Sequence, residues 1–168
     1  ETIECWETAL KSKNNPSAIA LSRQKLKYVS EHKSGENMSS KGGYVLKKNS
    51  DNPQVSLIAT GSEVEIALDA HQKLESESIY SKVVSVPCFD IFSNQTADYK
   101  NQVLGKDTFK ISIEAGSQTV WKNLVGKDGV TLGMTTYGKS APYKDIYNLF
   151  NLTSDEIIKI VKKRLKNN

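Results

Sequence analysis

The sequence has few of the features by which membrane, secreted and metal-binding proteins are recognised. No apolar run approaches the ~20 residues that a membrane-spanning helix needs. The first residues lack the basic segment and the apolar core of a signal peptide. The two cysteines, Cys5 and Cys88, match no metal-binding or redox spacing. We interpret them as reduced, structural thiols and expect a cytoplasmic protein without a membrane partner.

Signatures of common active sites are missing as well. The two histidines, His32 and His71, stand far apart, and no Ser-His-Asp arrangement can be assembled from them. His71 falls on the apolar side of a helical pattern, which indicates a packed side chain. The turn at 60–62 has neither the glycine and lysine spacing of a P-loop nor the three glycines of a dinucleotide fingerprint. We therefore predict no catalytic, cofactor-binding or metal-binding residue in this chain.

The charge is also modest, at +4. Much of the excess lies in the last turns, at Lys159, Lys162, Lys163, Arg164 and Lys166. Basic side chains there complement the negative end of a helix dipole, so a nucleic-acid partner is not needed to explain them.

What the sequence does contain is clearest in residues 55–74. An apolar run at 55–59 indicates a strand, and Thr60-Gly61-Ser62 then leads into an amphipathic helix over 62–77. Ser62 with Glu65, or Thr60 with Glu63, fits a capping box. Helix N-termini also bind anions, but we prefer structural capping as the role of this turn.

The rest of the chain alternates short strands and helices. Further strands are expected at 18–21, 43–46, 83–86, 109–113 and 130–134, and further helices at 1–11, 96–103, 117–125, 143–150 and from Thr153 onward. Thr153 with Glu156 fits a capping box, and Leu152 with Ile157 fits a hydrophobic staple. The pattern predicts a three-layer α/β fold, with a mostly parallel central sheet covered by helices.

Residues 30–43 are polar and rich in serine, glycine and asparagine, which is typical of a linker between domains. Before the linker, Ile3, Trp6 and Leu10 follow a helical pattern that begins at Glu1 without a cap. We interpret the sequence as part of a longer chain.

Three residues are candidates for binding or chemistry. Arg23 directly follows the predicted strand 18–21, where α/β sheets place ligands. A guanidinium there can hold a phosphate or carboxylate with two hydrogen bonds, and position alone supports anion binding and a salt bridge equally. Glu114 ends a strand and Lys139 lies in the polar loop 135–140. For both we prefer a structural or solvated role.

Six ordered blocks carry a family resemblance. They are ALSRQ (20–24), GGYVL (42–46), ATGSEVEIALDA (59–70), VVSVPCFDIF (83–92), IEAG (113–116) and GMTTYGKSAP (133–142). Together they resemble the C-terminal part of transketolase, a thiamine diphosphate enzyme that moves a two-carbon ketol unit between sugar phosphates in the pentose phosphate pathway. The resemblance implies that 1–34 end a pyrimidine-binding domain, 35–40 form a linker and 41–168 form the C-terminal domain.

The resemblance also implies roles. Arg23 matches the arginine of the SRQ motif, which contacts the phosphate of the sugar substrate. Thiamine diphosphate and a divalent metal, Mg or Ca, are implied for the full-length enzyme and not for this fragment, because the sequence has no Gly-Asp-Gly run. The C-terminal domain is expected to be non-catalytic and to serve in packing and in a homodimer.

Two alternatives stay open at this point. In the first, the chain is an autonomous α/β module that binds a small anion at 60–62 or mediates dimerisation. In the second, it is part of a sister thiamine diphosphate enzyme and not of a transketolase. Dihydroxyacetone synthase and deoxyxylulose phosphate synthase are the sister enzymes in question.

Overall fold

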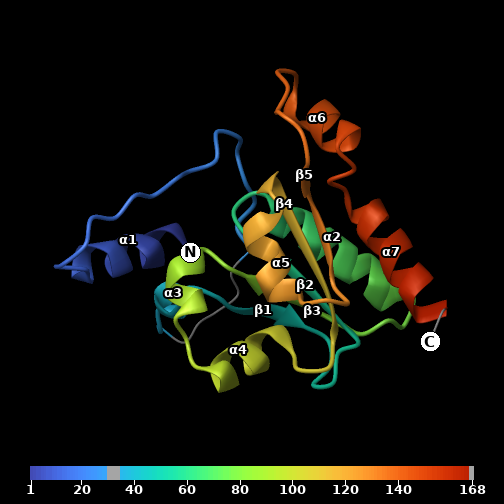
Figure 1. Ribbon diagram of the computed structural model, residues 1–168, viewed down its shortest axis with the longest axis horizontal. Coiled ribbons are helices and arrows are strands. Elements are labelled where there is room, and N and C mark those ends of the chain that lie inside the picture. The colour runs from blue at the N-terminus through green and yellow to red at the C-terminus, as the bar shows by residue number, and fades with distance from the viewer. Residues whose placement is uncertain (30–34, 167–168) are drawn as a thin grey trace.

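The computed structural model describes residues 1–29 and 35–166 (Figure 1). In chain order the elements are α1 (Thr2–Lys11), the 3₁₀ helix η1 (Met38–Lys41), β1 (Tyr44–Lys48), β2 (Val55–Ala59), α2 (Glu63–Ser76), β3 (Ser81–Ser85), α3 (Phe89–Ser93), α4 (Ala97–Leu104), β4 (Phe109–Ser117), α5 (Thr119–Val125), β5 (Val130–Met134), α6 (Tyr143–Leu149) and α7 (Ser154–Lys166). Every predicted helix is present, and α3 is an additional one.

The strands form a sheet in the order β1-β3-β2-β4-β5. Strands β2 to β5 are parallel, and β1 runs antiparallel beside β3 at the edge. At the end of β2, Ala59 pairs with Ser85 of β3 and with Ile113 of β4. The mostly parallel sheet is therefore confirmed, and its carboxyl ends meet along one edge.

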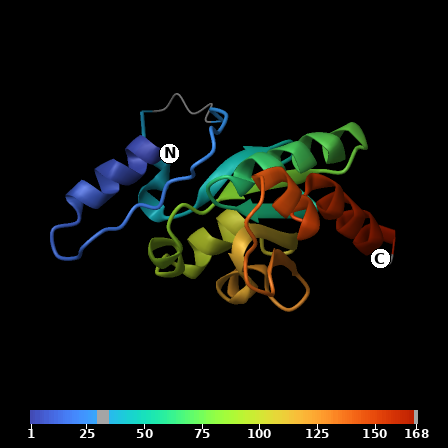
Figure 2. The same ribbon diagram turned by 90° about the horizontal axis from the view of Figure 1, so that it is seen from above.

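Helices cover both faces of the sheet, so the predicted three layers are confirmed. On one face α2 and α7 pack against β2, β3 and β4, around residues such as Leu57, Leu74 and Ile157. On the other face Phe92 of α3, Leu104 of α4 and residues of α5 pack together. Figure 2 shows α2 (green) and α4 (yellow-green) on opposite sides of the strands.

The start of α7 largely follows the predicted pattern. The N–H of Glu156 donates to Oγ1 of Thr153 at 3.3 Å, which is one half of the capping box. The Glu156 carboxylate instead pairs with Lys159. Leu152 and Ile157 are both buried in the core, where the staple places them.

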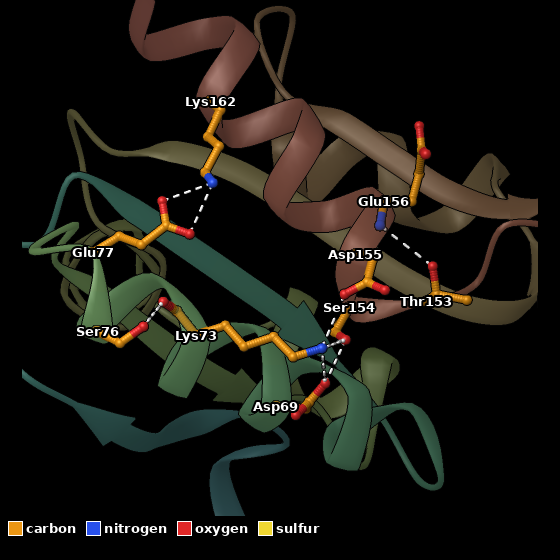
Figure 3. Close-up of polar contacts among 9 residues, drawn as sticks. All are labelled: Asp69, Lys73, Ser76, Glu77, Thr153, Ser154, Asp155, Glu156 and Lys162. Atoms are coloured by element: carbon orange, nitrogen blue, oxygen red, sulfur yellow. Dashed lines mark hydrogen bonds and ion pairs between the residues drawn. The ribbon is translucent and has the colours of Figure 1, made fainter.

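Polar contacts join α7 to α2 along their exposed side (Figure 3). Lys73 Nζ lies 2.9 Å from Ser154 Oγ and 2.9 Å from an oxygen of Asp155. Further along the two helices, Lys162 and Glu77 form an ion pair of 2.7 Å. These partly exposed contacts add a polar connection between the two helices, while the buried residues supply the packing.

The N-terminal part differs from this body. Helix α1 and the long segment that follows it lie to one side of the sheet in Figure 1. The predicted buried strand at 18–21 is wrong, because the segment pairs with no strand in the described part of the chain and Leu21 is 65% exposed. A short apolar run forms a buried strand only beside another strand.

The linker prediction needs one correction too. Residues 38–41 form the 3₁₀ helix η1, in which Ser39 is buried. Ser39 donates hydrogen bonds from its N–H and its hydroxyl to a carboxylate oxygen of Glu4 in α1, at 3.0 and 2.7 Å. Residues 30–34 of the predicted linker, with His32, lie outside the described residues, and the domain boundary remains a prediction.

Candidate functional site at the carboxyl edge of the sheet

The carboxyl edge of the parallel strands is where α/β sheets place their ligands. The register between β2 and β4 brings two segments together at this edge. Ala59 and Ile113 are paired, so Thr60, the first residue after β2, comes next to Glu114, which still belongs to β4. Thr60-Gly61-Ser62 then turns into α2, and Gly61 takes a φ of +52°, a left-handed conformation that glycine adopts easily.

The turn caps α2, but not in the predicted way. Neither capping box forms, since the side chain of Ser62 makes no capping hydrogen bond. The N–H groups of Glu63 and Val64 instead donate to the carbonyl oxygens of Thr60 and Gly61, at 3.2 and 3.4 Å. Because these backbone bonds occupy the first amides of the helix, the turn is less suited to an anion, which supports the structural role.

A cluster of hydrogen bonds explains why Ser62 does not cap. Its hydroxyl donates to Glu63 Oε1 at 3.0 Å and lies 3.2 Å from the hydroxyl of Tyr147 in α6. The Tyr147 hydroxyl donates to the same oxygen of Glu63. Glu114 of β4 belongs to the same site, because Glu63 contributes to the raised pKa of its carboxyl group. We call Ser62, Glu63, Glu114 and Tyr147 the edge cluster.

The edge cluster holds two carboxyl groups in a buried place. Glu63 is only 3% exposed, and Oε2 of Glu114 is buried without a protein hydrogen-bond partner. Burial, and secondly the neighbouring Glu63, raise the pKa of Glu114 to about 8. Burial and the bond to Glu63 raise the pKa of Tyr147 to about 12. This buried position therefore favours the neutral form of the Glu114 carboxyl group.

Arg23 lies near this edge, although no strand brings it there. A side chain added at Gly61 would have its first carbon 4.0 Å from Oγ of Ser22. The segment before Arg23 therefore passes beside the turn. Four residues later, Lys27 pairs with Glu65 of α2 at 2.9 Å. Arg23 itself is exposed, and among the described residues its guanidinium makes neither a hydrogen bond nor an ion pair.

The other predicted residues lie apart from the edge cluster. His71 is buried, with Nδ1 2.8 Å from Ser81 Oγ, and burial lowers its pKa, so its packed role is confirmed. Cys5 and Cys88 are unpaired, and burial raises the pKa of the Cys5 thiol. Lys139 is exposed in its loop.

Over residues 1–29 and 35–166, no group of three or more His, Cys, Asp or Glu side chains is placed to hold a metal ion. Within the same residues, no helix combines the length and apolar character needed to cross a membrane.

Sequence reasoning placed Glu114 at this edge but missed its partners Glu63 and Tyr147. The sequence pattern places Glu63 in a possible capping box and Tyr147 within the helix expected at 143–150, and neither pattern indicates a contact between them. One signal in the sequence could have indicated that Glu63 lies near Glu114: strands 55–59 and 109–113 are expected to run parallel to each other in the sheet. That makes the residues after them neighbours, although the sequence does not reveal that α6 lies over the same edge.

The fold and its edge define a three-layer α/β domain, and comparisons with known proteins identify its family. A family model described as "Transketolase-like TK C-terminal domain" matches residues 42–153. The transketolase of Sinorhizobium medicae is 45% identical over 159 residues, covering 94% of this chain and 23% of that protein. The transketolase of Aquifex aeolicus is 40% identical over 167 residues, covering 97% of this chain and 24% of that protein.

Solved structures agree with this match. The transketolase from Leishmania mexicana has a TM-score of 0.84 at 31% identity, and the match covers 99% of this chain and 24% of that one. This chain therefore belongs to the transketolase family, of which it contains the C-terminal domain. It spans about a quarter of the length of the relatives that it matches.

Proposed function

We propose that this chain forms part of a transketolase, a transferase that moves a two-carbon ketol unit between sugar phosphates in the pentose phosphate pathway. The observation that carries the proposal is the match to transketolases at 40–45% identity over 94–98% of the chain. This match includes residues before 42, so it extends beyond the C-terminal domain to the segment that holds Arg23.

In this proposal Arg23 binds the phosphate of the sugar substrate. Sequence position alone left anion binding and a salt bridge as equal alternatives. The exposed guanidinium has no carboxylate partner among the described residues, which favours anion binding. Holding the phosphate uses binding energy remote from the reacting carbons to place the substrate, while the chemistry takes place elsewhere.

Thiamine diphosphate and a divalent metal, Mg or Ca, would serve the complete enzyme. The residues described here do not fit either group, because they offer no cluster of metal ligands and the first amides of α2 are taken by the turn. In this proposal the chain therefore supplies packing and substrate binding and no catalytic residue.

We further propose that the complete enzyme is a cytoplasmic homodimer. The apolar side chains of Ile3, Trp6 and Leu10 on α1 are exposed, and an exposed apolar face of this kind is typical of a surface that packs against another part of an assembly. Analytical ultracentrifugation of the complete enzyme tests this, and a monomer at micromolar concentration would contradict it.

The role of Arg23 is tested in the complete transketolase that contains this sequence, with an Arg23→Ala variant. Hydrogen bonds to a charged group contribute about 1.5–3 kcal/mol, so KM for a phosphorylated ketose should rise about 10- to 100-fold. KM for an unphosphorylated ketose should change little, and kcat for both should be nearly unchanged.

Lys25→Ala is the matched control, since Lys25 is an exposed basic residue in the same segment. It removes one positive charge without touching Arg23 and should leave both KM values within about twofold, the size of long-range effects through screened solvent. Equal losses for the phosphorylated and unphosphorylated ketoses in Arg23→Ala would refute the phosphate contact.

A further inference from the structure

The segment that carries Arg23 contacts the start of α2 on both sides of that residue. Before it, Oγ of Ser22 lies 4.0 Å from the first carbon of a side chain added at Gly61. After it, Nζ of Lys27 forms an ion pair of 2.9 Å with Glu65, in the first turn of α2. The two contacts on α2 and its preceding turn are therefore close together, and Arg23 lies between the two contacts on the segment.

The backbone between these contacts is bent. The bend falls at Arg23 and Gln24, and Arg23 is exposed there. Five extended residues can span about 17 Å, whereas one helical turn rises only about 5.4 Å. The chain between Ser22 and Lys27 is thus longer than the distance it has to cover, and the bend takes up the difference. A shift at either contact would move the Arg23 guanidinium.

A third contact lies further along the segment. Val29 packs against the core that α2 and α7 form with the sheet. A groove of about 880 Å³ lies between the segment and helices α2 and α6, and its lining includes Leu26, Ile66 and Tyr143. Because the segment spans this groove, separate contacts fix its course and continuous packing does not.

The ion pair stands on a rigid support. Glu65 lies on α2, where its neighbours Val64 and Ala67 are buried in the core. The hydrogen bond to Glu65, and further the charge of Asp69, raise the pKa of Lys27, so its side chain is held in the charged form. A group on a packed helix positions its partner more precisely than a group on a loop does.

We propose that Glu65 and Val29 are positioning residues for Arg23, which hold its guanidinium where it binds the substrate phosphate. Glu65 acts through Lys27, and Val29 acts through the core of the C-terminal domain. The inference rests on the proposed phosphate contact of Arg23. It gives this domain a part in substrate binding, because a small misplacement of a group that anchors the substrate weakens binding and orientation together.

The first experiment measures KM in the complete transketolase that contains this sequence. Glu65→Gln removes the partner of Lys27 and should raise KM for a phosphorylated ketose about two- to fivefold, as for loss of an exposed ion pair. KM for an unphosphorylated ketose and both kcat values should stay nearly unchanged. The sign is informative, since removal of a negative charge near a phosphate would by itself lower KM. An unchanged or lowered KM overturns the role of Glu65.

A charge exchange separates the ion pair from the charges that form it. Lys27→Glu should raise KM for the phosphorylated ketose, and Lys27→Glu combined with Glu65→Lys should return it to within about twofold of wild type, because the pair forms again in reverse. Lys25→Glu is the matched control, since it makes the same change of charge at an exposed position of the same segment. Equal increases in Lys27→Glu, Lys25→Glu and the exchanged pair would show that charge alone is responsible and would overturn the proposal.

The second anchor is tested without any change of charge. Val29→Ala shortens a side chain that packs against the core and should raise KM for the phosphorylated ketose at least about twofold. Val120→Ala is the control, because it makes the same change at a valine of α5 that is 45% exposed, and it should alter neither KM. Equal increases for both ketoses in Val29→Ala would show a general structural role and would contradict positioning.

Limited trypsin digestion of the complete enzyme follows the segment without reference to activity. Cleavage after Arg23 and Lys25 should be about two- to fivefold faster in Glu65→Gln than in wild type, because release of the ion pair raises the population of the open segment. Glu75→Gln is the control, since Glu75 is an exposed glutamate of the same helix, and its cleavage rate should equal that of wild type. Equal rates in Glu65→Gln and wild type also overturn the proposal.

Arg23→Ala in the same assays separates this inference from the proposed function. A selective loss for phosphorylated ketoses in Arg23→Ala, with no effect of Glu65→Gln or Val29→Ala, would leave the phosphate contact in place and refute positioning by the C-terminal domain. Equal losses for both kinds of ketose in Arg23→Ala would refute the phosphate contact, and the positioning role would be refuted with it.

Discussion

Helices α1 and α7 are both amphipathic, yet they contact the rest of the chain through opposite faces. On α7, Ile157 and Val161 are completely buried against the sheet and α2. On α1, Ile3 and Leu10 are 85% and 76% exposed. An amphipathic pattern thus specifies which side chains favour burial, and it does not specify which surface buries them.

Helix α1 is held through its polar side. Its carboxylates receive hydrogen bonds from the body, from Ser39 to Glu4 and from Tyr44 and Ser85 to Glu1. Such contacts orient the helix but release little apolar surface from water, and burial of apolar surface is the main source of stability. The body is therefore expected to fold on its own core, while α1 contributes little to its stability.

This contrast agrees with the proposal that the chain acts within a complete transketolase. The apolar side chains of α1 would then pack against a surface supplied by the rest of the enzyme. By contrast, Ile157 and Val161 of α7 are already fully buried within the described body.

The largest expected effect is in α7. Ile157→Ala removes a fully buried side chain from the centre of the α2–α7 core. The free energy of unfolding should fall by about 3 kcal/mol, since the change loses both transfer energy and packing and leaves a cavity. Urea denaturation followed by circular dichroism measures it, and a loss below about 1 kcal/mol would mean that α7 is not part of the cooperative core.

The helices and strands of the body were predictable because their patterns are local. Alternation and helical spacing depend on neighbouring residues, and these gave strands 55–59 and 130–134 with the observed bounds. Strand β4 is longer than expected and continues to Ser117, through an irregularity between Ile113 and Ser117 in its pairing with β5. A change in pairing of that kind depends on the partner strand and has no local signal.

The N-terminal segment and the edge cluster were less predictable for the same reason. The run at 18–21 has the composition of a buried strand, but burial requires a neighbouring strand that the described chain does not provide. The edge cluster joins Glu63 to Tyr147 across 84 positions of the chain. Helical spacing correctly placed both residues in helices, and only the packing of α6 over the sheet edge shows that they meet.

An intermediate effect is expected at the start of α7. Thr153→Ala removes the hydroxyl that accepts the N–H of Glu156, so stability should fall by about 1 kcal/mol, as for other N-caps. Thr153→Ser keeps the hydroxyl and is the matched control. If both variants lose the same amount, the methyl group of Thr153 is responsible and the cap is not.

The smallest effect is expected from the same chemical change in α1. Ile3→Ala truncates an isoleucine as Ile157→Ala does, but Ile3 is 85% exposed, so the free energy of unfolding should change by less than about 0.5 kcal/mol. The measurement is urea denaturation at two protein concentrations at least tenfold apart. A loss of about 2 kcal/mol that grows with concentration would mean that the apolar face of α1 packs against a second copy of the chain. A loss of that size independent of concentration would mean that the face is buried within one chain, and the contrast between α1 and α7 would then be wrong.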